Sequence, residues 1–267
     1  MNWIKVKGLV VEKIRGEGLK VLFVHGSNGG SWYWHNFMEI FNNAGFEVYA
    51  NNLRGHDPNP DVPDLGKVSI YEYIQDTRHV VKKIKPDVII GHSMGGLIAQ
   101  KILEEFDLKA AILACSAPPK NVKYHIRKIF KFGWYSMQQI KAAKNDEPLN
   151  MIYKMAREFA LNNMTEQEAE KYFKKFVPES SLVAHEVGKK PIVDIDNGKI
   201  KCPVLAIGAE KDYTIGPKTA KQLAKKYNGD FMLLKNNGHM FMIENNHETV
   251  ANDIINWINK NTTVKDI

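Results

Sequence analysis

Residues 87–96 read Asp87-Val88-Ile89-Ile90-Gly91-His92-Ser93-Met94-Gly95-Gly96, and this stretch decides the fold. An apolar strand pattern, Asp87–Ile90, runs into a G-x-S-x-G sequence, and a helical pattern, Leu97–Phe106, follows it. A sharp turn from strand to helix would strain the backbone of Ser93 and project its oxygen above the carboxyl edge of a sheet. The pentapeptide by itself is a weak signal, because small residues also suit an ordinary turn between a strand and a helix.

Strand and helix patterns alternate on both sides of this turn. Five more apolar runs have the length of strands: Leu19–Val24, Phe46–Ala50, Ala110–Ala114, Pro203–Ile207 and Asp230–Leu234. Apolar residues at three- and four-residue spacing predict helices over Trp34–Asn43, Ile70–Ile84, Pro217–Tyr227 and His247–Asn259. Several of the strand runs are apolar throughout, which is typical of strands covered on both faces. The sequence therefore predicts an α/β fold with a doubly wound, mostly parallel sheet.

The alternation stops in the middle of the chain. Four helical patterns occur there without strands between them: Val122–Phe132, Ser136–Ala143, Leu149–Leu161 and Glu166–Phe176. Thr165 and Glu168 form a capping-box sequence at the start of the last one. We therefore expect a sheet domain built from residues 1–118 and 197–267, with residues 119–196 as a helical cap inserted into it.

Composition excludes several classes of protein. The chain has 267 residues, of which 44% are hydrophobic and 25% charged, as in ordinary globular proteins. The net charge of +7 is spread thinly, without a nucleic-acid-binding motif, so we expect no nucleic-acid partner. Cys115 and Cys202 are far apart and have no metal-binding spacing, so we expect neither a metal nor an organic cofactor. No signal peptide or membrane-spanning run is recognised, which favours a cytoplasmic protein.

Three further loops carry chemically useful residues at predicted strand ends. After Leu19–Val24 comes the glycine-rich loop His25-Gly26-Ser27-Asn28-Gly29-Gly30, which matches neither the phosphate-binding nor the dinucleotide-binding pattern. Its Ser27 amide, together with the Met94 amide, could bind a negatively charged oxygen. Asp212 follows the strand Pro203–Ile207, and His239 follows Asp230–Leu234. Ser93, Asp212 and His239 therefore occur in an order known for one hydrolase architecture.

Together these motifs resemble the α/β-hydrolase family. The resemblance covers Lys20–Pro118 and Lys201–Asn259, and the helical insert stands where the family carries its cap. Leu53-Arg54-Gly55-His56 is similar to the loop after the family's fourth strand. The resemblance implies a catalytic triad of Ser93, Asp212 and His239, with an oxyanion hole formed by the amides of Ser27 and Met94.

The resemblance implies transfer of an acyl group to water. His239 would take the proton of Ser93, and Asp212 would orient the imidazole. The leading hypothesis is a serine carboxylesterase acting on small-molecule esters, with Trp32 and Trp134 as candidate substrate contacts. A lipase or lysophospholipase acting on monoacyl lipids is a second hypothesis, because basic and apolar residues interleave over Lys120–Lys144 and could touch an anionic membrane surface. A third is a slow-turnover binding protein with a hydrolase fold. The substrate, the acyl acceptor and the oligomeric state stay open.

Overall fold

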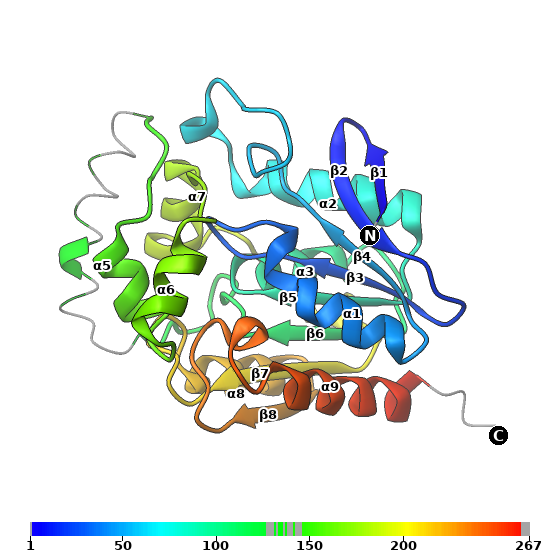
Figure 1. The fold of residues 1–267 in the computed structure, drawn as a ribbon. Helices are drawn as coiled ribbons and strands as arrows, with labels where there is room; N and C mark the ends of the chain where they lie inside the picture. Colours follow the sequence, from blue (N-terminus) through cyan, green and yellow to red (C-terminus); the bar gives the residue numbers. More distant parts are fainter. Residues whose placement is uncertain are drawn as a thin grey trace.

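The computed structural model describes residues 2–126, 131, 133–135, 137, 141 and 146–262. Within them, one eight-stranded sheet has the order β1-β2-β4-β3-β5-β6-β7-β8 (Figure 1). Its strands are β1 (Asn2–Val6), β2 (Leu9–Ile14), β3 (Lys20–Val24), β4 (Glu47–Asn51), β5 (Val88–His92), β6 (Ala110–Ala114), β7 (Val204–Ala209) and β8 (Asp230–Leu234). The strands from β3 onward pair in parallel, which confirms the predicted mostly parallel α/β sheet.

The hairpin at the start of the chain was not predicted. Strand β1 pairs antiparallel with β2, and β2 pairs antiparallel with β4. The first strand lies at the edge of the sheet and carries polar residues, with Trp3 mostly exposed. An edge strand of this kind lacks the continuous apolar run by which the other strands are recognised.

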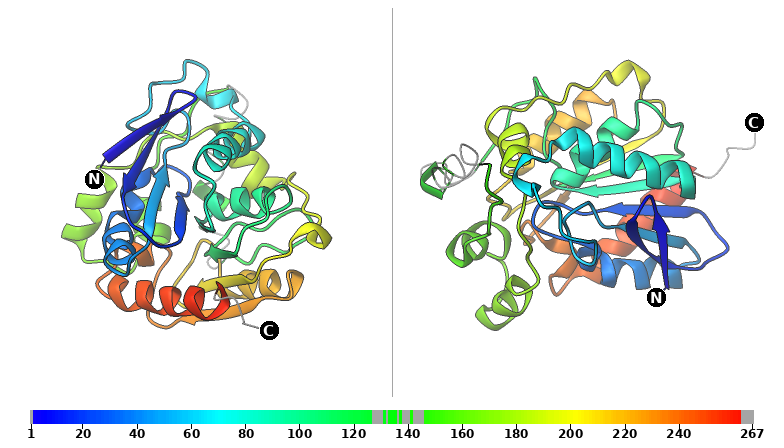
Figure 2. Two further views of the ribbon diagram at one scale, coloured as in Figure 1. Left: turned by 90° about the vertical axis from the view of Figure 1, so that its right-hand side faces the viewer. Right: turned by 90° about the horizontal axis from the view of Figure 1, so that it is seen from above.

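Helices cover both faces of the sheet (Figure 2). One face packs against α1 (His35–Asn43) and α9 (His247–Thr262), and the other against α2 (Ile70–Ile84), α3 (Met94–Ile102) and α8 (Pro217–Lys226). Successive residues of β3 bury their side chains on opposite faces, since Leu22 joins one hydrophobic cluster and Phe23 the other. This two-sided burial explains why the central strands are apolar throughout.

The insert between β6 and β7 is mainly helical, and we call residues 119–196 the cap. Its described helices are α5 (Tyr153–Met155) with the π-helical turn η3 (Ala156–Ala160), α6 (Glu166–Phe173), and α7 (Ser181–Ala184) with the π-helical turn η4 (His185–Lys189). Figure 1 places α5, α6 and α7 together beyond one end of the sheet. The capping box of Thr165 and Glu168 is present at the start of α6.

Other short helical turns connect the elements of the core. The 3-10 turns are η1 (Ser31–Trp34), η2 (Leu65–Lys67), η5 (Asn197–Lys199) and η6 (Phe241–Ile243). Among the described residues, no helix is both long and apolar enough to cross a membrane.

Some predicted helices differ from those observed. Residues 122–126 are not helical, whereas Lys131 is. The other residues of the helix predicted over Val122–Phe132, and most of those of the helix predicted over Ser136–Ala143, lie outside the described residues. The helix predicted from Leu149 starts only at Tyr153, because Leu149 instead forms a β-bridge with Glu179. Helix α3 starts at Met94, three residues before the predicted Leu97, because the turn at Ser93 leads directly into it.

Two glycines allow this turn to pack against its neighbours. A Cβ atom on Gly91 would lie 2.3 Å from the carbonyl oxygen of Gly95. A Cβ atom on Gly95 would lie 2.3 Å from the carbonyl oxygen of His25 and 2.4 Å from that of Val24. All of these obstacles are backbone atoms, which cannot move aside as a side chain can. The amino end of α3 therefore approaches the end of β3 as closely as a glycine permits.

We predict that Gly95→Ala destabilises the protein. The added methyl group would force apart the backbones of β3 and α3, and overpacking of this kind costs about 1–3 kcal/mol. Urea unfolding followed by circular dichroism measures the loss. Gly188→Ala is the matched control, because nothing lies within 4 Å of a Cβ atom placed there. Equal stabilities of the two variants would contradict the close approach.

Candidate active site

Ser93 lies at the turn between β5 and α3, in a strained backbone conformation. Its φ angle is 53°, in the left-handed region that residues other than glycine rarely adopt. Backbone hydrogen bonds hold the turn, because the Ser93 amide donates to the carbonyl of Ala114 at 3.0 Å. The Ser93 carbonyl in turn accepts from the amides of Gly96 at 3.0 Å and Ala117 at 2.9 Å. The side chain is thus presented at the positive end of the α3 dipole.

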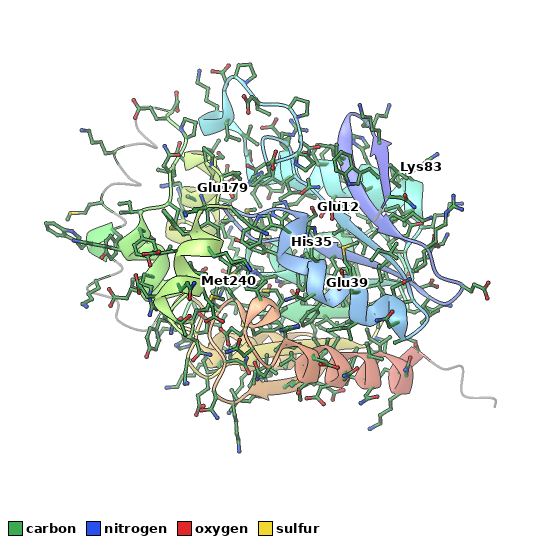
Figure 3. All side chains as sticks on the ribbon, viewed as in Figure 1. Glu12, His35, Glu39, Lys83, Glu179 and Met240 are labelled. Carbon is green, nitrogen blue, oxygen red and sulfur yellow. The ribbon has the colours of Figure 1, made fainter. Side chains whose placement is uncertain are left out.

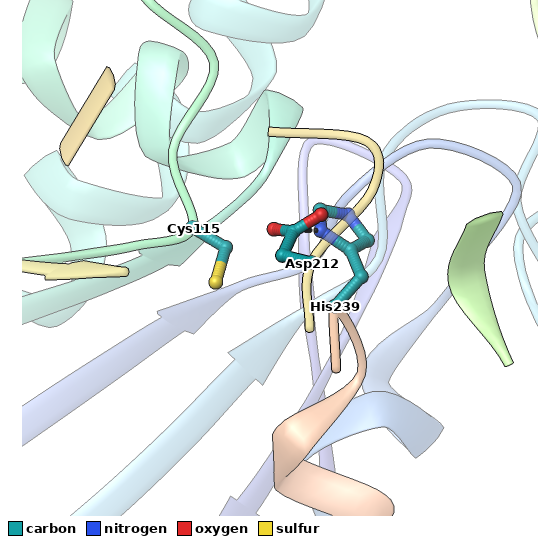
Figure 4. A group of neighbouring side chains, drawn as sticks. All are labelled: Cys115, Asp212 and His239. Atoms are coloured by element: carbon teal, nitrogen blue, oxygen red, sulfur yellow. Dashed lines mark hydrogen bonds and ion pairs between the residues drawn. The ribbon is translucent and has the colours of Figure 1, made fainter. Parts of the chain in front are cut away.

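Asp212 and His239 form a buried hydrogen-bonded pair (Figure 4). They follow β7 and β8, which are neighbouring parallel strands, so both lie at the same edge of the sheet. His239 Nδ1 lies 2.8 Å from Asp212 Oδ2. The other carboxylate oxygen, Oδ1, accepts the amides of Thr214 and Ile215, each at 2.8 Å. The carboxylate is therefore held in one orientation, and the imidazole keeps its Nε2 atom for another partner.

The Asp212–His239 pair also lies next to the turn at Ser93. His92, which precedes Ser93, has its Nε2 atom 3.0 Å from the carbonyl oxygen of His239. The rings of His92 and His239 have centroids 4.5 Å apart. Ser93 and His239 line the same cavity. The structure therefore brings all three predicted residues, Ser93, Asp212 and His239, to one edge of the sheet.

Cys115 is a third neighbour of this pair (Figure 4). Ligand atoms of Cys115, Asp212 and His239 all lie within 4.8 Å of one another, close enough to consider a metal site. Burial raises the pKa of the thiol well above its usual range, and the adjacent Asp212 raises it further. A protonated thiol is a poor metal ligand, and both Asp212 oxygens already accept hydrogen bonds. The chemistry of this group suits a hydrogen-bonded acid–imidazole pair better than a metal centre.

The two predicted backbone donors lie beside Ser93. A Cβ atom on Gly26 would lie 2.9 Å from the Cβ atom of Ser93, so the glycine-rich loop packs directly on the serine turn. The Ser27 hydroxyl lies 3.5 Å from the sulfur of Met94, and both residues line the cavity. Within the described part of the chain, no acceptor for the Ser27 or Met94 amide is found. Both amides thus remain available for a ligand oxygen.

Hydrogen bonds of the His25 side chain fix the orientation of the Ser27 amide. Its Nε2 atom accepts the amide of Leu53 at 3.1 Å, so Nδ1 carries the proton and donates to the Gly26 carbonyl at 2.8 Å. Burial and the neighbouring His56 lower the pKa of His25 to about 3, which keeps the ring neutral. The Gly26 carbonyl and the Ser27 N–H are opposite ends of one planar trans peptide. A hydrogen bond that holds the carbonyl therefore also sets the direction of the N–H.

A cavity of about 430 Å³ opens onto Ser93 between the core and the cap. Its core side includes Tyr33, Met94, Thr214 and Met240. Its cap side is mostly apolar, with Tyr124, Tyr135, Met151, Ile152, Met155, Phe159, Phe176 and Val187 among the lining residues.

Trp32 and Trp134 are not among the described residues that line this cavity. The Trp32 ring stacks on Tyr172 of α6, with centroids 6.0 Å apart, and also lies against Phe176. Trp134 is 68% exposed to solvent. Tyr33, the neighbour of Trp32, lines the cavity instead.

Comparison with known proteins agrees with this architecture. A model of the alpha/beta hydrolase family matches residues 21–252, which is most of the chain. The chain belongs to the alpha/beta hydrolase family. Salicylic acid-binding protein 2 from Nicotiana tabacum is 24% identical to this chain over 154 residues, which are 51% of this chain and 57% of the relative. The match thus spans little more than half the length of that relative.

Solved structures share the fold of this chain over nearly their whole length. An esterase from Exiguobacterium antarcticum has a TM-score of 0.75 at 18% identity, covering 96% of this chain and 98% of that one. A thermophilic esterase from Thermogutta terrifontis has a TM-score of 0.76 at 20% identity, covering 98% of this chain and 100% of that one. At these identities the likeness concerns the fold.

Glu244 supports the loop that carries His239 and was not predicted from the sequence. Its carboxylate accepts the Gly238 amide at 2.9 and 3.1 Å, and the side-chain amides of Asn163 at 2.7 Å and Asn237 at 3.0 Å. Burial raises the pKa of Glu244, although these hydrogen bonds oppose the rise. Asn163 belongs to the cap, so the cap takes part in holding the loop that carries His239.

Glu179 is a second residue that sequence reasoning missed. It is a buried cap residue that lines the cavity, and its Oε2 atom lies 3.3 Å from Nε2 of the buried His56. His56 Nδ1 lies 3.1 Å from the carbonyl oxygen of Arg54. Both partners of this ring are acceptors, so both ring nitrogens carry protons and the imidazole is charged. No local sequence signal marks the pair, because its members are 123 positions apart.

The pKa values of the two residues move in opposite directions. Burial disfavours the charged ring of His56, but the charge and hydrogen bond of Glu179 outweigh burial and raise the pKa of His56 above its ordinary value. Burial also disfavours the Glu179 carboxylate, yet His56, Tyr73 and the Ser180 amide lower the pKa of Glu179 below its ordinary value. The protein thus holds a buried ion pair between its core and its cap.

We predict that His56→Gln destabilises the protein in a pH-dependent way. The stabilisation from a raised histidine pKa is complete below about pH 6.5 and is lost as the pH rises through the folded-state value. The loss of unfolding free energy should therefore be larger at pH 6, at roughly 3 kcal/mol for a broken buried pair, than at pH 9. Urea unfolding of both proteins at the two pH values measures it. A loss independent of pH would rule out a charged His56.

Proposed function

We propose that this hydrolase cleaves carboxylic esters through an acyl-enzyme intermediate on Ser93. The observation that carries the proposal is the buried Asp212–His239 pair, 2.8 Å between Nδ1 and Oδ2, whose imidazole lines the same cavity as Ser93. A serine hydroxyl is a weak nucleophile until an adjacent base takes its proton. His239 is the only histidine among the described cavity-lining residues that is bonded to a carboxylate through Nδ1.

The reaction would proceed in two halves. His239 Nε2 takes the proton of Ser93, whose oxygen attacks the ester carbonyl, and the imidazolium then protonates the leaving alcohol. In the second half, His239 activates a water molecule that attacks the acyl-enzyme and releases the acid. Asp212 holds the imidazole in the required tautomer and stabilises its positive charge.

The tetrahedral intermediates carry a negative oxygen that needs fixed donors. The amides of Ser27 and Met94 are available for it, and the Met94 amide lies at the positive end of α3. Donors held in place before the reaction stabilise this charge without reorganisation, and losing one costs roughly 3 kcal/mol in the barrier.

The cavity supports an uncharged, largely apolar substrate. None of its described lining residues is Lys or Arg, and the lining carboxylate of Glu179 is already paired with His56. Four methionines line the cavity and can adapt to irregular shapes: Met94, Met151, Met155 and Met240. Its volume of about 430 Å³ lies at the small end of the usual range for ligand pockets. These features favour a carboxylesterase of small to medium esters over a lipase.

Binding without rapid turnover is the second candidate function. The observation that favours it is the similarity to salicylic acid-binding protein 2 of Nicotiana tabacum, which is named for binding a small acid. In that case a small acid or its ester would occupy the same cavity, and Ser93 would react slowly.

We predict that Ser93→Ala abolishes ester hydrolysis, with a fall in kcat of about a million-fold, because no nucleophile remains. Asp212→Asn should lower kcat by about ten thousand-fold, because an amide favours the wrong imidazole tautomer. Initial rates on p-nitrophenyl acetate measure both variants. Cys115→Ala, a change beside the same pair, serves as the control and should lower kcat far less. Hydrolysis by Ser93→Ala at the wild-type rate would refute the proposal.

We also predict that kcat/KM is highest for esters with short to medium acyl chains. A sixteen-carbon chain gains no binding energy from the carbons beyond the cavity, and it has to displace packed lining residues to reach Ser93. We therefore expect kcat/KM to fall by about tenfold or more. A series of p-nitrophenyl esters from acetyl to palmitoyl measures this dependence. A maximum at the longest chain would favour the lipase reading.

Covalent labelling of Ser93 distinguishes an enzyme from a binding protein with slow turnover. Rapid modification of Ser93 by a fluorophosphonate, found by mass spectrometry and absent in Ser93→Ala, supports an enzyme. Failure of the wild-type protein to react would favour the binding protein.

A further inference from the structure

Asn28, the residue after the proposed oxyanion donor Ser27, is enclosed by the cap. Its backbone amide donates to Glu179 Oε2 at 3.2 Å, and its carbonyl accepts the Val177 amide at 3.1 Å. Its side-chain amide donates to the carbonyls of Val177 at 2.9 Å and Leu149 at 3.5 Å. All four of these hydrogen bonds are made with residues of the cap, which lie far along the chain from Asn28. The glycine-rich loop of the core therefore takes its hydrogen bonds at this point from the cap.

Glu179 is the centre of these contacts, at the boundary of cap and core (Figure 3). Only 2% of it is exposed, and its two oxygens accept four hydrogen bonds. Oε2 accepts from the Asn28 amide at 3.2 Å and from His56 at 3.3 Å. Oε1 accepts from the Tyr73 hydroxyl at 2.7 Å and from the Ser180 amide at 2.8 Å. An ionised carboxylate can accept hydrogen bonds at both of its oxygens, whereas a side-chain amide has only one acceptor oxygen.

The backbone around Ser27 is held on both sides. The Ser27 carbonyl accepts the Tyr33 hydroxyl at 2.9 Å, and the N–H of the same peptide, which belongs to Asn28, donates to Glu179. Asn28 has a φ angle of 57°, a left-handed conformation that needs such support. The peptide that follows Ser27 is thus fixed at both ends, and the peptide before it is held by His25, so the Ser27 amide has little freedom to turn away from the cavity.

We propose that Glu179 is a positioning residue of the reaction: by holding the Asn28 amide, this cap carboxylate aims the Ser27 amide at the oxygen of the tetrahedral intermediate. The oxyanion site is then complete only when the cap is docked on the core. The inference rests on the proposed function, because it assigns Glu179 a part in the same chemistry. Although Glu179 lines the cavity, the role assigned to it here acts through Asn28 and not through contact with the substrate.

The substitution Glu179→Gln tests this assignment. The amide group would place N–H donors opposite either Tyr73 and Ser180 or His56 and Asn28, so one pair of contacts is lost. We expect kcat on p-nitrophenyl acetate to fall by about 10- to 100-fold, because one of two donors is displaced rather than removed. KM should change by less than about threefold, since the donor acts on the transition state.

Two further readouts distinguish positioning from loss of stability. Phenylboronic acid, which forms a tetrahedral adduct with a serine, should bind Glu179→Gln more weakly by about the same factor as the fall in kcat. Hydrogen–deuterium exchange should be faster at the amides of residues 26–30 in Glu179→Gln than in the wild type. Neither change is expected from a substitution that only lowers global stability while leaving the protein folded.

Glu12→Gln is the matched control. Glu12 is also a buried glutamate bonded to a histidine, with Oε2 2.8 Å from His35 Nε2, and it lies in β2 beside α1 (Figure 3). The control should keep the wild-type kcat and the wild-type exchange at residues 26–30. If Glu179→Gln does not fold, Tyr73→Phe replaces it, because this change removes one donor to the same carboxylate. A loss in kcat without a change in KM then supports the inference, and an unchanged kcat overturns it.

The outcomes separate the inference from the proposed function. Wild-type kcat and wild-type exchange in Glu179→Gln overturn the inference and leave the proposed function intact, provided that Ser93→Ala is inactive. If the wild-type protein neither hydrolyses esters nor binds phenylboronic acid, the proposed function fails, and with it the assignment of Glu179 to that reaction.

Discussion

Close contact between the end of β3 and the start of α3 is the constraint on which the site depends. Gly95 lets the two backbones meet, since a Cβ atom there would lie 2.3 Å from the His25 carbonyl oxygen. This contact brings the glycine-rich loop after β3 beside the strained turn at Ser93. The proposed nucleophile and both proposed oxyanion donors therefore occupy one small region whose geometry is set by backbone packing.

The cap covers the site and also holds the loops of the site by hydrogen bonds. Asn162 donates to the carbonyl of Lys211, next to Asp212, at 2.9 Å, and Asn163 donates to the carbonyl of Asn236, near His239, at 2.8 Å. Glu179 reaches the glycine-rich loop in the same way. Residues of the cap thus bond to all three loops that carry Ser27, Asp212 and His239. Displacement of the cap would loosen each of these loops.

The parts of the fold that could be predicted are those with local signals. Central strands such as Ala110–Ala114 are apolar throughout because helices cover both of their faces, and the structure confirms the predicted strands within one or two residues. The hairpin of β1 and β2 was missed because β1 lies at an edge and needs no apolar run. The helix expected from Leu149 starts late because a β-bridge to Glu179, a long-range contact, outweighs local periodicity.

The sequence by itself determined the parallel strands β3 to β8, the turn at Ser93 and the order of Ser93, Asp212 and His239. These features have local signals, because strand ends and turn residues can be recognised from a few neighbouring residues. Tertiary structure decided which aromatic side chains line the cavity, where Tyr33 takes the place expected of Trp32. It also decided the partners of Glu179, which come from residues 28, 56 and 73. A buried carboxylate is stable only where distant donors converge on it, and that convergence exists only in the folded chain.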